Sequence, residues 1–378
     1  MADGAVTRRP VICFLTGTLN ALAGAERVTA SIASALAARG YRIHVLSLWD
    51  EASAFPLHPA VTHRALFPVR PSFKRQYAAT VWRIRRFMLT HDIDVLVEVD
   101  PMLTLFTLPA LFGSRVRRVA WEHCHFDEDL GKPARRVARR LAARTAAAVV
   151  VLTDADRLRW RAAIRHPFQI AVIANPLPFD LPPRMEAPMQ AKRVLAVGRL
   201  VEAKGFDILL EAWALVVREA PDWRLEIVGE GPARPALEAL AAQYGVSKTV
   251  SMPGERTDIA SAYRQAGVFC LSSRYEGFGL VLLEAMAFGL PVVASACEAG
   301  PKALLVEGGN AVMVPPEDGP ALARALLRVI GDPDLRWQLA KGGRLTAAAH
   351  TVDRLVDQEW EALLRGVVTG NGGAAPSE

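Results

Sequence analysis

The chain has 378 residues, of which 51% are hydrophobic and 22% charged, a composition typical of a globular protein and unlike that of a disordered one. One hydrophobic core rarely supports this length, so we expect two domains. The first residues, MADGAVTRRP, contain no apolar signal core, and the longest apolar stretch, near MLTLFTLPALF, is too short to cross a bilayer. A cytoplasmic location is therefore predicted. The four cysteines, Cys13, Cys124, Cys270 and Cys297, show no metal-ligand spacing, and we expect them to be reduced core residues.

Positive charge is concentrated in the first half. Residues 1–175 carry 25 Lys/Arg against 14 Asp/Glu, whereas residues 176–378 carry 20 against 25. The segment KPARRVARR predicts a helix with four arginines on one face, Arg135, Arg136, Arg139 and Arg140, and with Val137 and Leu141 on the other. Two interpretations stay open: this face binds anionic lipid headgroups, or it is simply solvated. Nucleic acid is disfavoured because no basic strand with interleaved aromatics and no zinc spacing is present.

In chain order, the first half alternates apolar runs with helical segments. The expected strands are VICFLTGT, YRIHVLSL, IDVLVEV, RVAWEH, AAAVVVLT and IAVIAN, and a helix over residues 25–39 ends at Gly40. The stretch between YRIHVLSL and IDVLVEV reads as irregular. The proline-rich segment NPLPFDLPPRMEAPMQ follows as a linker.

The same alternation starts again after the linker. Expected strands include RVLAVGRL, WRLEIVGEG, VSMPG, GVFCLSS, PVVAS and AVMVPP, and three helices follow at residues 317–330, 334–348 and 352–367. The fold class is therefore α/β, with two doubly wound, Rossmann-like domains facing across a cleft. We place the domains at 1–175 and 193–350, the linker at 176–192, and a C-terminal helix with a disordered tail, GNGGAAPSE, at 351–378.

The segment RYEGFGLVLLEAMAFGLPVVAS combines acids, glycines and a helix. Apolar spacing predicts a helix from Leu280, which Gly289 ends and Pro291 cannot continue. Glu276 then lies in the loop before the helix and Glu284 about one turn inside it. Unpaired N–H groups at a helix start favour an anion, which points to a phosphorylated ligand that also has hydroxyl groups.

Two cations lie on a second loop, GRLVEAKG. Arg199 and Lys204 are five residues apart between a predicted strand and a predicted helix, where they could clamp a diphosphate. A basic pair in a loop is more often solvated surface. Together with Glu276 and Glu284, however, the pair describes a site for a nucleotide sugar.

GRLVEAKG followed by EGFGLVLLEAMAFGLPVVAS resembles glycosyltransferase family 4, the retaining enzymes of the GT-B fold with an E-x7-E motif. GAERV, WEHCHF and NPL are further similar to the amylovoran-type bacterial exopolysaccharide glycosyltransferases. The resemblance implies that Glu276 contacts hydroxyls of the donor sugar and that Glu284 accepts from the ribose. It also implies that the diphosphate is held by these groups: Arg199, Lys204 and the backbone N–H groups of Gly277, Phe278 and Gly279.

The resemblance also assigns roles in the first half. His123 would lie against the donor sugar, preferred over His125 on motif position, and Gly24 with Glu26 would form a loop beneath the phosphates. The family often has two glycines before AERV, whereas Ala23 precedes Gly24 here. This departure puts the position of that loop in doubt.

The implied reaction transfers a sugar, with retention, from a nucleoside diphosphate sugar, preferably UDP, to a saccharide or a polyprenyl-diphosphate-linked saccharide in exopolysaccharide or cell-surface glycan biosynthesis. No carboxylate in the sequence can be identified as a nucleophile for the anomeric carbon, which favours front-face attack by the acceptor. No metal and no cofactor are expected, and the one DID, Asp92 to Asp94, looks structural. A lipid-linked acceptor would make the enzyme peripheral on the inner face of the membrane.

Three other functions compete with this interpretation. An NAD-dependent dehydrogenase is disfavoured because Gly17 and Gly24 do not have the spacing of a dinucleotide-binding loop. A nucleotide-sugar epimerase of the same fold would be separated by an assay for transfer against isomerisation. A non-catalytic sugar-nucleotide-binding subunit of a polysaccharide assembly complex is disfavoured because the residues of the predicted site are all present.

Overall fold

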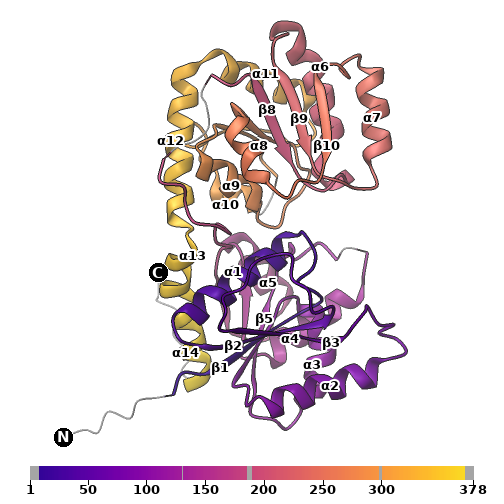
Figure 1. The fold of residues 1–378 in the computed structure, drawn as a ribbon, viewed down its shortest axis with the longest axis vertical. Helices are drawn as coiled ribbons and strands as arrows, with labels where there is room; N and C mark the ends of the chain where they lie inside the picture. The colour runs from indigo at the N-terminus through magenta and orange to yellow at the C-terminus, as the bar shows by residue number, and fades with distance from the viewer. Residues whose placement is uncertain (1–7, 130, 185–189, 298–299, 371–378) are drawn as a thin grey trace, which may run out of the picture. The chain divides into compact units, whose positions relative to one another are not determined.

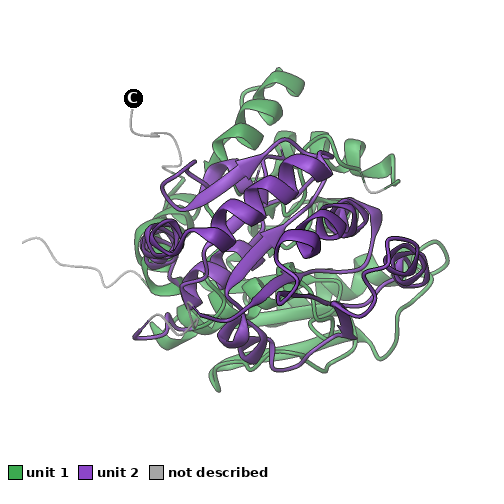
Figure 2. Cartoon of the chain, turned by 90° about the horizontal axis from the view of Figure 1, so that it is seen from above, with its two compact units in different colours: residues 1–179, 352–378 green, residues 180–351 purple. Residues whose placement is uncertain are grey.

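The computed structural model describes residues 8–129, 131–184, 190–297 and 300–370. The chain divides into two compact units, residues 1–179 with 352–378, and residues 180–351 (Figures 1 and 2). The last helical segment therefore belongs to the first unit. The predicted disordered tail falls almost entirely outside the described residues.

The first unit is built on a parallel sheet of seven strands in its described part, in the order β3-β2-β1-β4-β5-β6-β7. These strands are β1 Val11–Thr16, β2 Arg42–Trp49, β3 Val61–Phe67, β4 Val95–Glu98, β5 Arg117–Trp121, β6 Ala148–Val151 and β7 Ile170–Val172. Its helices are α1 Gly24–Ala38, α2 Tyr77–Thr90, α3 Thr104–Ala110 preceded by the short η1 Pro101–Leu103, α4 Ala134–Thr145 and α5 Asp154–Ala163. Strands β1 and β4 lie side by side, although α1, β2, β3 and α2 separate them in the chain.

The end of the chain completes the core of this unit. Elements α13 Val352–Leu355, η3 Val356–Trp360 and α14 Glu361–Thr369 follow one another. Trp360 is fully buried, and its ring lies 4.8 Å from that of Trp121 on β5 and 6.3 Å from that of Phe14 on β1. Arg39, after α1, pairs with Asp353 and Asp357. Apolar packing and ion pairs thus hold this segment against the first sheet.

The second unit has a parallel sheet of six strands over its described residues, ordered β10-β9-β8-β11-β12-β13. These are β8 Arg193–Val197, β9 Arg224–Val228, β10 Val250–Gly254, β11 Val268–Leu271, β12 Val292–Ser295 and β13 Ala311–Val314. The helices are η2 Glu202–Lys204, α6 Phe206–Glu219, α7 Arg234–Gln243, α8 Ile259–Gln265, α9 Leu280–Phe288, α10 Gly300–Leu304, α11 Gly319–Gly331 and α12 Pro333–Ala349. The three helices predicted to close the chain, over residues 317–330, 334–348 and 352–367, are confirmed.

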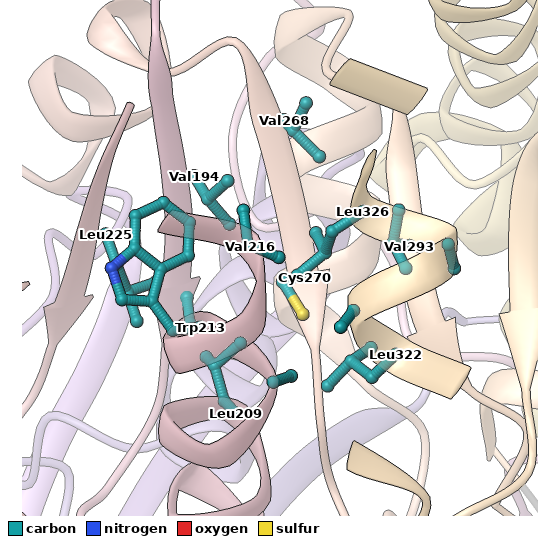
Figure 3. Packing of buried hydrophobic residues seen from close by; sticks show 14 of the residues in the cluster. Val194, Leu209, Trp213, Val216, Leu225, Val268, Cys270, Val293, Leu322 and Leu326 are labelled. Atoms are coloured by element: carbon teal, nitrogen blue, oxygen red, sulfur yellow. The ribbon is translucent and has the colours of Figure 1, made fainter. Parts of the chain in front are cut away.

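One helical layer of this unit packs its apolar side on the sheet (Figure 3). Leu209, Trp213 and Val216 of α6 and Leu322 and Leu326 of α11 meet strand residues such as Val194, Leu225, Val268, Cys270 and Val293, all nearly inaccessible to solvent. Strands that are apolar throughout are expected where helices cover a parallel sheet. The prediction that cysteines serve as core residues is confirmed for Cys13, Cys270 and Cys297, while Cys124 is only partly buried.

The prediction of an irregular segment between β2 and β4 is wrong. The segment contains the edge strand β3 and the helix α2. Among the described strands, β3 pairs with β2 alone, and it is half-buried along most of its length. Helix α2 buries just Thr80, Ile84 and Met88. Because so few of their side chains enter the core, neither element shows a strong apolar period in the sequence.

Candidate active site

Two loops meet where the strand order of the second sheet reverses. Strands β8 and β11 are neighbours, but the chain continues from β8 toward β10 and from β11 toward β13. Loops at the carboxyl ends of such strands form the usual ligand-binding edge of a doubly wound sheet. Residues 198–205 follow β8 and carry Arg199 and Lys204, and residues 272–279 follow β11 and carry Glu276.

Lys204 and Glu276 are in direct contact across these loops. The Lys204 Nζ donates to Glu276 Oε1 at 2.5 Å, and Ser273 Oγ donates to the same oxygen at 2.8 Å. Glu276 is buried, with 9% of its surface exposed. The stem of Lys204 runs over Gly198, where an added Cβ would lie 3.3 Å from the lysine Cε. The sequence predicted that Glu276 and Lys204 lie close together, and the structure shows them in contact.

Arg274 joins the two loops. Its guanidinium makes two hydrogen bonds to the Asp207 carboxylate at 2.7 and 2.8 Å, donates to the Glu202 carbonyl at 2.8 Å and pairs with Glu317 at 2.7 Å. The paired acids favour the charged form and raise the pKa of Arg274 above its ordinary range. Because carboxylates hold the Arg274 guanidinium on two sides, this side chain has little rotational freedom. It thereby fixes the Glu276 loop to the start of α6.

Gly205 allows the backbones of the two loops to touch. Its φ of 60° is left-handed, and a Cβ here would lie 2.1 Å from the carbonyl oxygen of Ser272. Ser272 Oγ also donates to the Lys204 carbonyl at 2.9 Å. Only glycine combines this conformation with such a close approach.

Helix α9 begins beside these groups. Gly279 precedes it in the left-handed region (φ 84°), Gly289 ends it at φ 81°, and β12 follows as a fully buried strand, as predicted. Gly300 packs so closely on the preceding loop that a Cβ would lie 2.3 Å from the Cα of Phe278. Backbone contacts thus set the path of residues 277–279 in front of the helix.

Glu284 lies one turn inside α9 and is 4% exposed. The hydroxyl of Tyr263, on α8, donates to Glu284 Oε2 at 2.8 Å. Tyr263 is itself fully buried and stacks on Phe288 with ring centroids 5.3 Å apart. A buried hydrogen-bonded carboxylate of this kind is a preorganised acceptor for ligand hydroxyls.

Arg199 lies on the same loop as Lys204. Its side chain is exposed and pairs with no carboxylate in the part of the chain that the structure describes. An unpaired guanidinium next to a helix start and an ammonium group remains available for an anionic ligand. The structure thus brings Lys204 and Glu276 into contact, and places Arg199 on the Lys204 loop and Glu284 on the helix after the Glu276 loop.

The other predicted site residues belong to the first unit. β5 ends at Trp121, so His123 and His125 lie in the following loop. The ring of His123 packs at 4.2 Å from that of Trp121, and its Nε2 is buried with no hydrogen-bond partner among the described residues. Burial lowers the pKa of His123 to about 4, so the imidazole is neutral at physiological pH. His125 is held differently: its Nδ1 accepts from the Asp127 N–H at 3.2 Å.

Gly24 and Glu26 form the first turn of α1, not a loop before it as the resemblance implied. The preceding residue, Ala23, provides no side-chain cap. Burial raises the pKa of Glu26 above its usual range. Because Glu26 is in the first turn of α1, its carboxyl group lies at the positive end of the helix dipole.

Models of two families together cover most of the chain. The model described as glycosyl transferases group 1 matches residues 180–346, and that of glycosyltransferase family 4 matches residues 22–181. An uncharacterised glycosyltransferase of Haemophilus influenzae is 30% identical over 93% of this chain and 99% of its own length. The chain belongs to glycosyltransferase family 4.

The relatives of this glycosyltransferase include the predicted subgroup. The amylovoran biosynthesis glycosyltransferase AmsD of Erwinia amylovora is 26% identical over 90% of this chain and 95% of its own length. Among solved structures, sucrose-phosphate synthase from Thermosynechococcus elongatus has a TM-score of 0.83 at 21% identity, covering 96% and 100% of the two chains. HepE of Anabaena, solved with UDP, has a TM-score of 0.77 at 23% identity, covering 93% and 99%. These neighbours confirm the GT-B fold.

One prediction about the first unit of the enzyme is wrong. The four arginines of α4 do not share an exposed face, because Arg135 and Arg139 are 3% and 1% exposed. Arg135 pairs with Asp100 at 2.7 Å, and Arg139 pairs with Glu122 at 2.6 Å. Val137, expected on the apolar side, is half exposed instead. The acids at the ends of β4 and β5 draw the arginines inward, since buried charges require partners.

The buried Arg139 also holds the loop that carries His123 in place. Arg139 donates to the carbonyl oxygens of His125, Phe126 and Glu128 as well as to Glu122. Burial outweighs the neighbouring arginines and raises the pKa of Glu122 to about 7. A single guanidinium thus anchors both ends of the loop that carries His123 and His125.

Sequence reasoning missed three supporting residues of the glycosyltransferase: Ser273, Arg274 and Tyr263. Ser273 and Arg274 stand three and two positions before Glu276, and this proximity is their only signal in the sequence. Tyr263 has none, because its contact with Glu284 depends on the packing of α8 against α9. The predicted structural role of Asp94 is confirmed, since it accepts from Arg8 and from the Val11 N–H.

Two features concern metals and membranes. In the described ranges no group of three or more His, Cys, Asp or Glu side chains is arranged to hold a metal ion. No helix over the same residues is both long and apolar enough to span a bilayer.

Proposed function

We propose that this glycosyltransferase takes a sugar from a UDP-sugar and transfers it, with retention, to a saccharide or lipid-linked saccharide of a bacterial exopolysaccharide or surface glycan. The observation that carries the proposal is the Lys204–Glu276 contact at the strand-order reversal, beside the start of α9. This ion pair places a cation that would bind phosphate, Lys204, next to a carboxylate that would accept from sugar hydroxyls, Glu276. HepE was solved with UDP and with UDP-glucose, and AmsD acts in amylovoran biosynthesis by its name.

In this proposal each group has a defined task. Arg199 and Lys204 hold the diphosphate with the N–H groups of residues 277–279, and Glu284 accepts from the ribose hydroxyls. Glu276 and His123 bind hydroxyls of the transferred sugar. His123 is neutral, and its Nε2 has no hydrogen-bond partner in the described part of the chain, so this side chain suits a hydroxyl better than a phosphate.

Departure of the diphosphate would develop negative charge on the leaving oxygen. The cations and N–H groups are already in place in the folded loops, so they stabilise this charge without reorganisation. We propose front-face attack, in which the leaving phosphate takes the proton of the acceptor hydroxyl. The protein cations would neutralise the phosphates, so we also propose that the enzyme needs no metal ion; full activity in the presence of EDTA is the expected result.

A thermal-shift screen with UDP, GDP and ADP tests the donor site. A ligand that binds only the folded state raises the melting temperature by mass action, and UDP should give the largest rise. Glu284→Ala should abolish the UDP shift. If no nucleotide shifts the wild type, or if the variant responds fully, the donor site is misassigned. Proton NMR of the product formed from a UDP-α-sugar separates retention from inversion.

A further inference from the structure

Helix α2 has an exposed face that is both apolar and basic. Its buried residues, Thr80, Ile84 and Met88, point toward the sheet. At 100° per residue, Trp82 and Leu89 project from the opposite side, and they are 57% and 52% exposed. Large apolar side chains that gather in such exposed positions are typical of an interaction surface.

The apolar surface extends beyond the helix. Val69, in the loop between β3 and α2, is 72% exposed, and Phe112, after α3, is 82% exposed. Arg85 of α2 donates to the carbonyl oxygens of Ala110 and Phe112 at 2.8 and 3.0 Å, so the Phe112 backbone lies next to α2. Figure 1 shows α2 beside α3 in the first unit. We call Val69, Trp82, Leu89 and Phe112, with the cations around them, the α2 surface.

The cations of this surface lack acidic partners. Residues 68–90 contain six Lys or Arg and no Asp or Glu. None of the six forms an ion pair with a carboxylate among the described residues: Arg70, Lys74, Arg75, Arg83, Arg85 and Arg86. The arginines of α4 differ, because Arg135, Arg136 and Arg139 all pair with acids. The α2 surface therefore retains its full positive charge.

Arginine and tryptophan are also in contact on this surface. The Arg86 guanidinium lies over the Trp82 ring, 5.3 Å from its centroid, and Arg83 lies 4.4 Å from the centroid of Phe67. Such stacking keeps the arginine stems flat along apolar surface. Trp beside Arg, with Leu and Phe nearby, is the composition of an amphipathic surface that lies in a lipid interface.

We propose that the α2 surface binds an anionic lipid bilayer, with its cations on the headgroups and its four exposed apolar side chains in the interfacial layer. A polyanion such as nucleic acid would satisfy the cations but would leave Val69 and Leu89 uncovered, so the lipid is favoured. The loop before α2 leaves the carboxyl end of β3, the same edge of the sheet that carries His123. Membrane binding would thus bring a lipid-linked acceptor to the edge where the first unit presents its candidate site residues.

Co-sedimentation with vesicles of phosphatidylcholine and phosphatidylglycerol tests the proposal. The wild type should bind these vesicles and should not bind phosphatidylcholine alone. Surface cations strengthen binding to an anionic membrane, so the double variant Arg75→Gln/Arg86→Gln should bind at least tenfold more weakly. Trp82→Ser/Leu89→Ser should weaken binding at least as much through lost apolar contact.

Two matched controls keep the test specific. Arg140→Gln/Arg144→Gln removes the same charge from exposed positions on α4, and Trp337→Ser/Leu345→Ser removes a Trp and a Leu that are 53% and 68% exposed on α12. Both controls should bind vesicles like the wild type. Equal losses in the controls would overturn the proposal, and so would absence of wild-type binding.

Further outcomes separate lipid binding from other causes. Normal vesicle binding by the Trp82/Leu89 variant, together with arginine-dependent binding of double-stranded DNA, would show a general polyanion surface and would also overturn the proposal. The UDP thermal shift should be the same in all these variants, since the α2 surface contains none of the donor-site residues. A missing UDP shift with intact vesicle binding would therefore count against the donor site alone.

Discussion

The Tyr263 hydroxyl donates a hydrogen bond to Glu284 Oε2 at 2.8 Å, and both side chains are buried. This bond fixes the carboxylate from the side of α8, so in the proposed donor site Tyr263 would position Glu284 for the nucleotide. Tyr263→Phe keeps the stacking on Phe288 and removes only the donor. Since hydrogen bonds to charged groups contribute about 1.5 to 3 kcal/mol, UDP affinity should fall by about tenfold or more. Calorimetric titration with UDP measures the change, and an unaltered dissociation constant would show that Tyr263 has no positioning role.

Lys204 should matter for the chemical step more than for folding. Lys204→Met keeps most of the stem over Gly198 but removes the charge that faces both Glu276 and the proposed phosphate. Loss of one such stabilising group should lower kcat about 10² to 10³-fold. Lys192→Met is the matched control, because Lys192 also pairs with an acid, Asp222, but both side chains are largely exposed. Equal activity of the two variants would contradict the proposed role of Lys204.

Local patterns predicted helix α9 and its surroundings well. Gly289 has the left-handed conformation expected of a helix-ending glycine, and β12 follows at once. The contact between Lys204 and Glu276 could be predicted only as proximity, because the residues are 72 positions apart. Parallel topology brings the two loops to one edge of the sheet, but it does not determine which side chains touch.

The first unit shows where sequence reasoning fails. The helix period alone predicted one exposed face for the four arginines of α4, whereas ion pairs with Glu122 and Asp100, on other elements, bury two of them. Helix α2 was missed because only three of its residues are buried, and because large apolar residues also lie on its exposed face. In both cases partners distant in the sequence decide which face of the helix is buried, and a local pattern contains no information about them.

Gly205 should be required for the two loops of the proposed donor site to pack. Gly205→Ala meets both a left-handed φ of 60° and a clash with the Ser272 carbonyl oxygen. Gly245→Ala is the matched control: its φ is 70°, but nothing lies within 4 Å of the added Cβ. We expect about 1 to 2 kcal/mol of destabilisation for Gly245→Ala from conformation alone, and at least about 2 kcal/mol more for Gly205→Ala, in the range of severe core substitutions. Urea unfolding of both variants measures the difference, and equal losses would mean that the contact with Ser272 is relaxed without cost.

His123 makes the stability of the first unit depend on pH. An unfolded histidine has a pKa near 6.5, whereas burial lowers that of His123 to about 4. Between these values the unfolded chain binds a proton that the folded chain does not, so stability is fully present above about pH 6.5 and is lost as the pH falls toward 4. Relative to His123→Gln, the wild type should lose up to about 3 kcal/mol over this window. The comparison cancels the opposite contribution of Glu122, whose raised pKa is present in both proteins. Urea unfolding at pH 7.5, 6, 5 and 4 measures the difference, and parallel pH profiles would show that burial does not lower the pKa of His123 in the folded enzyme.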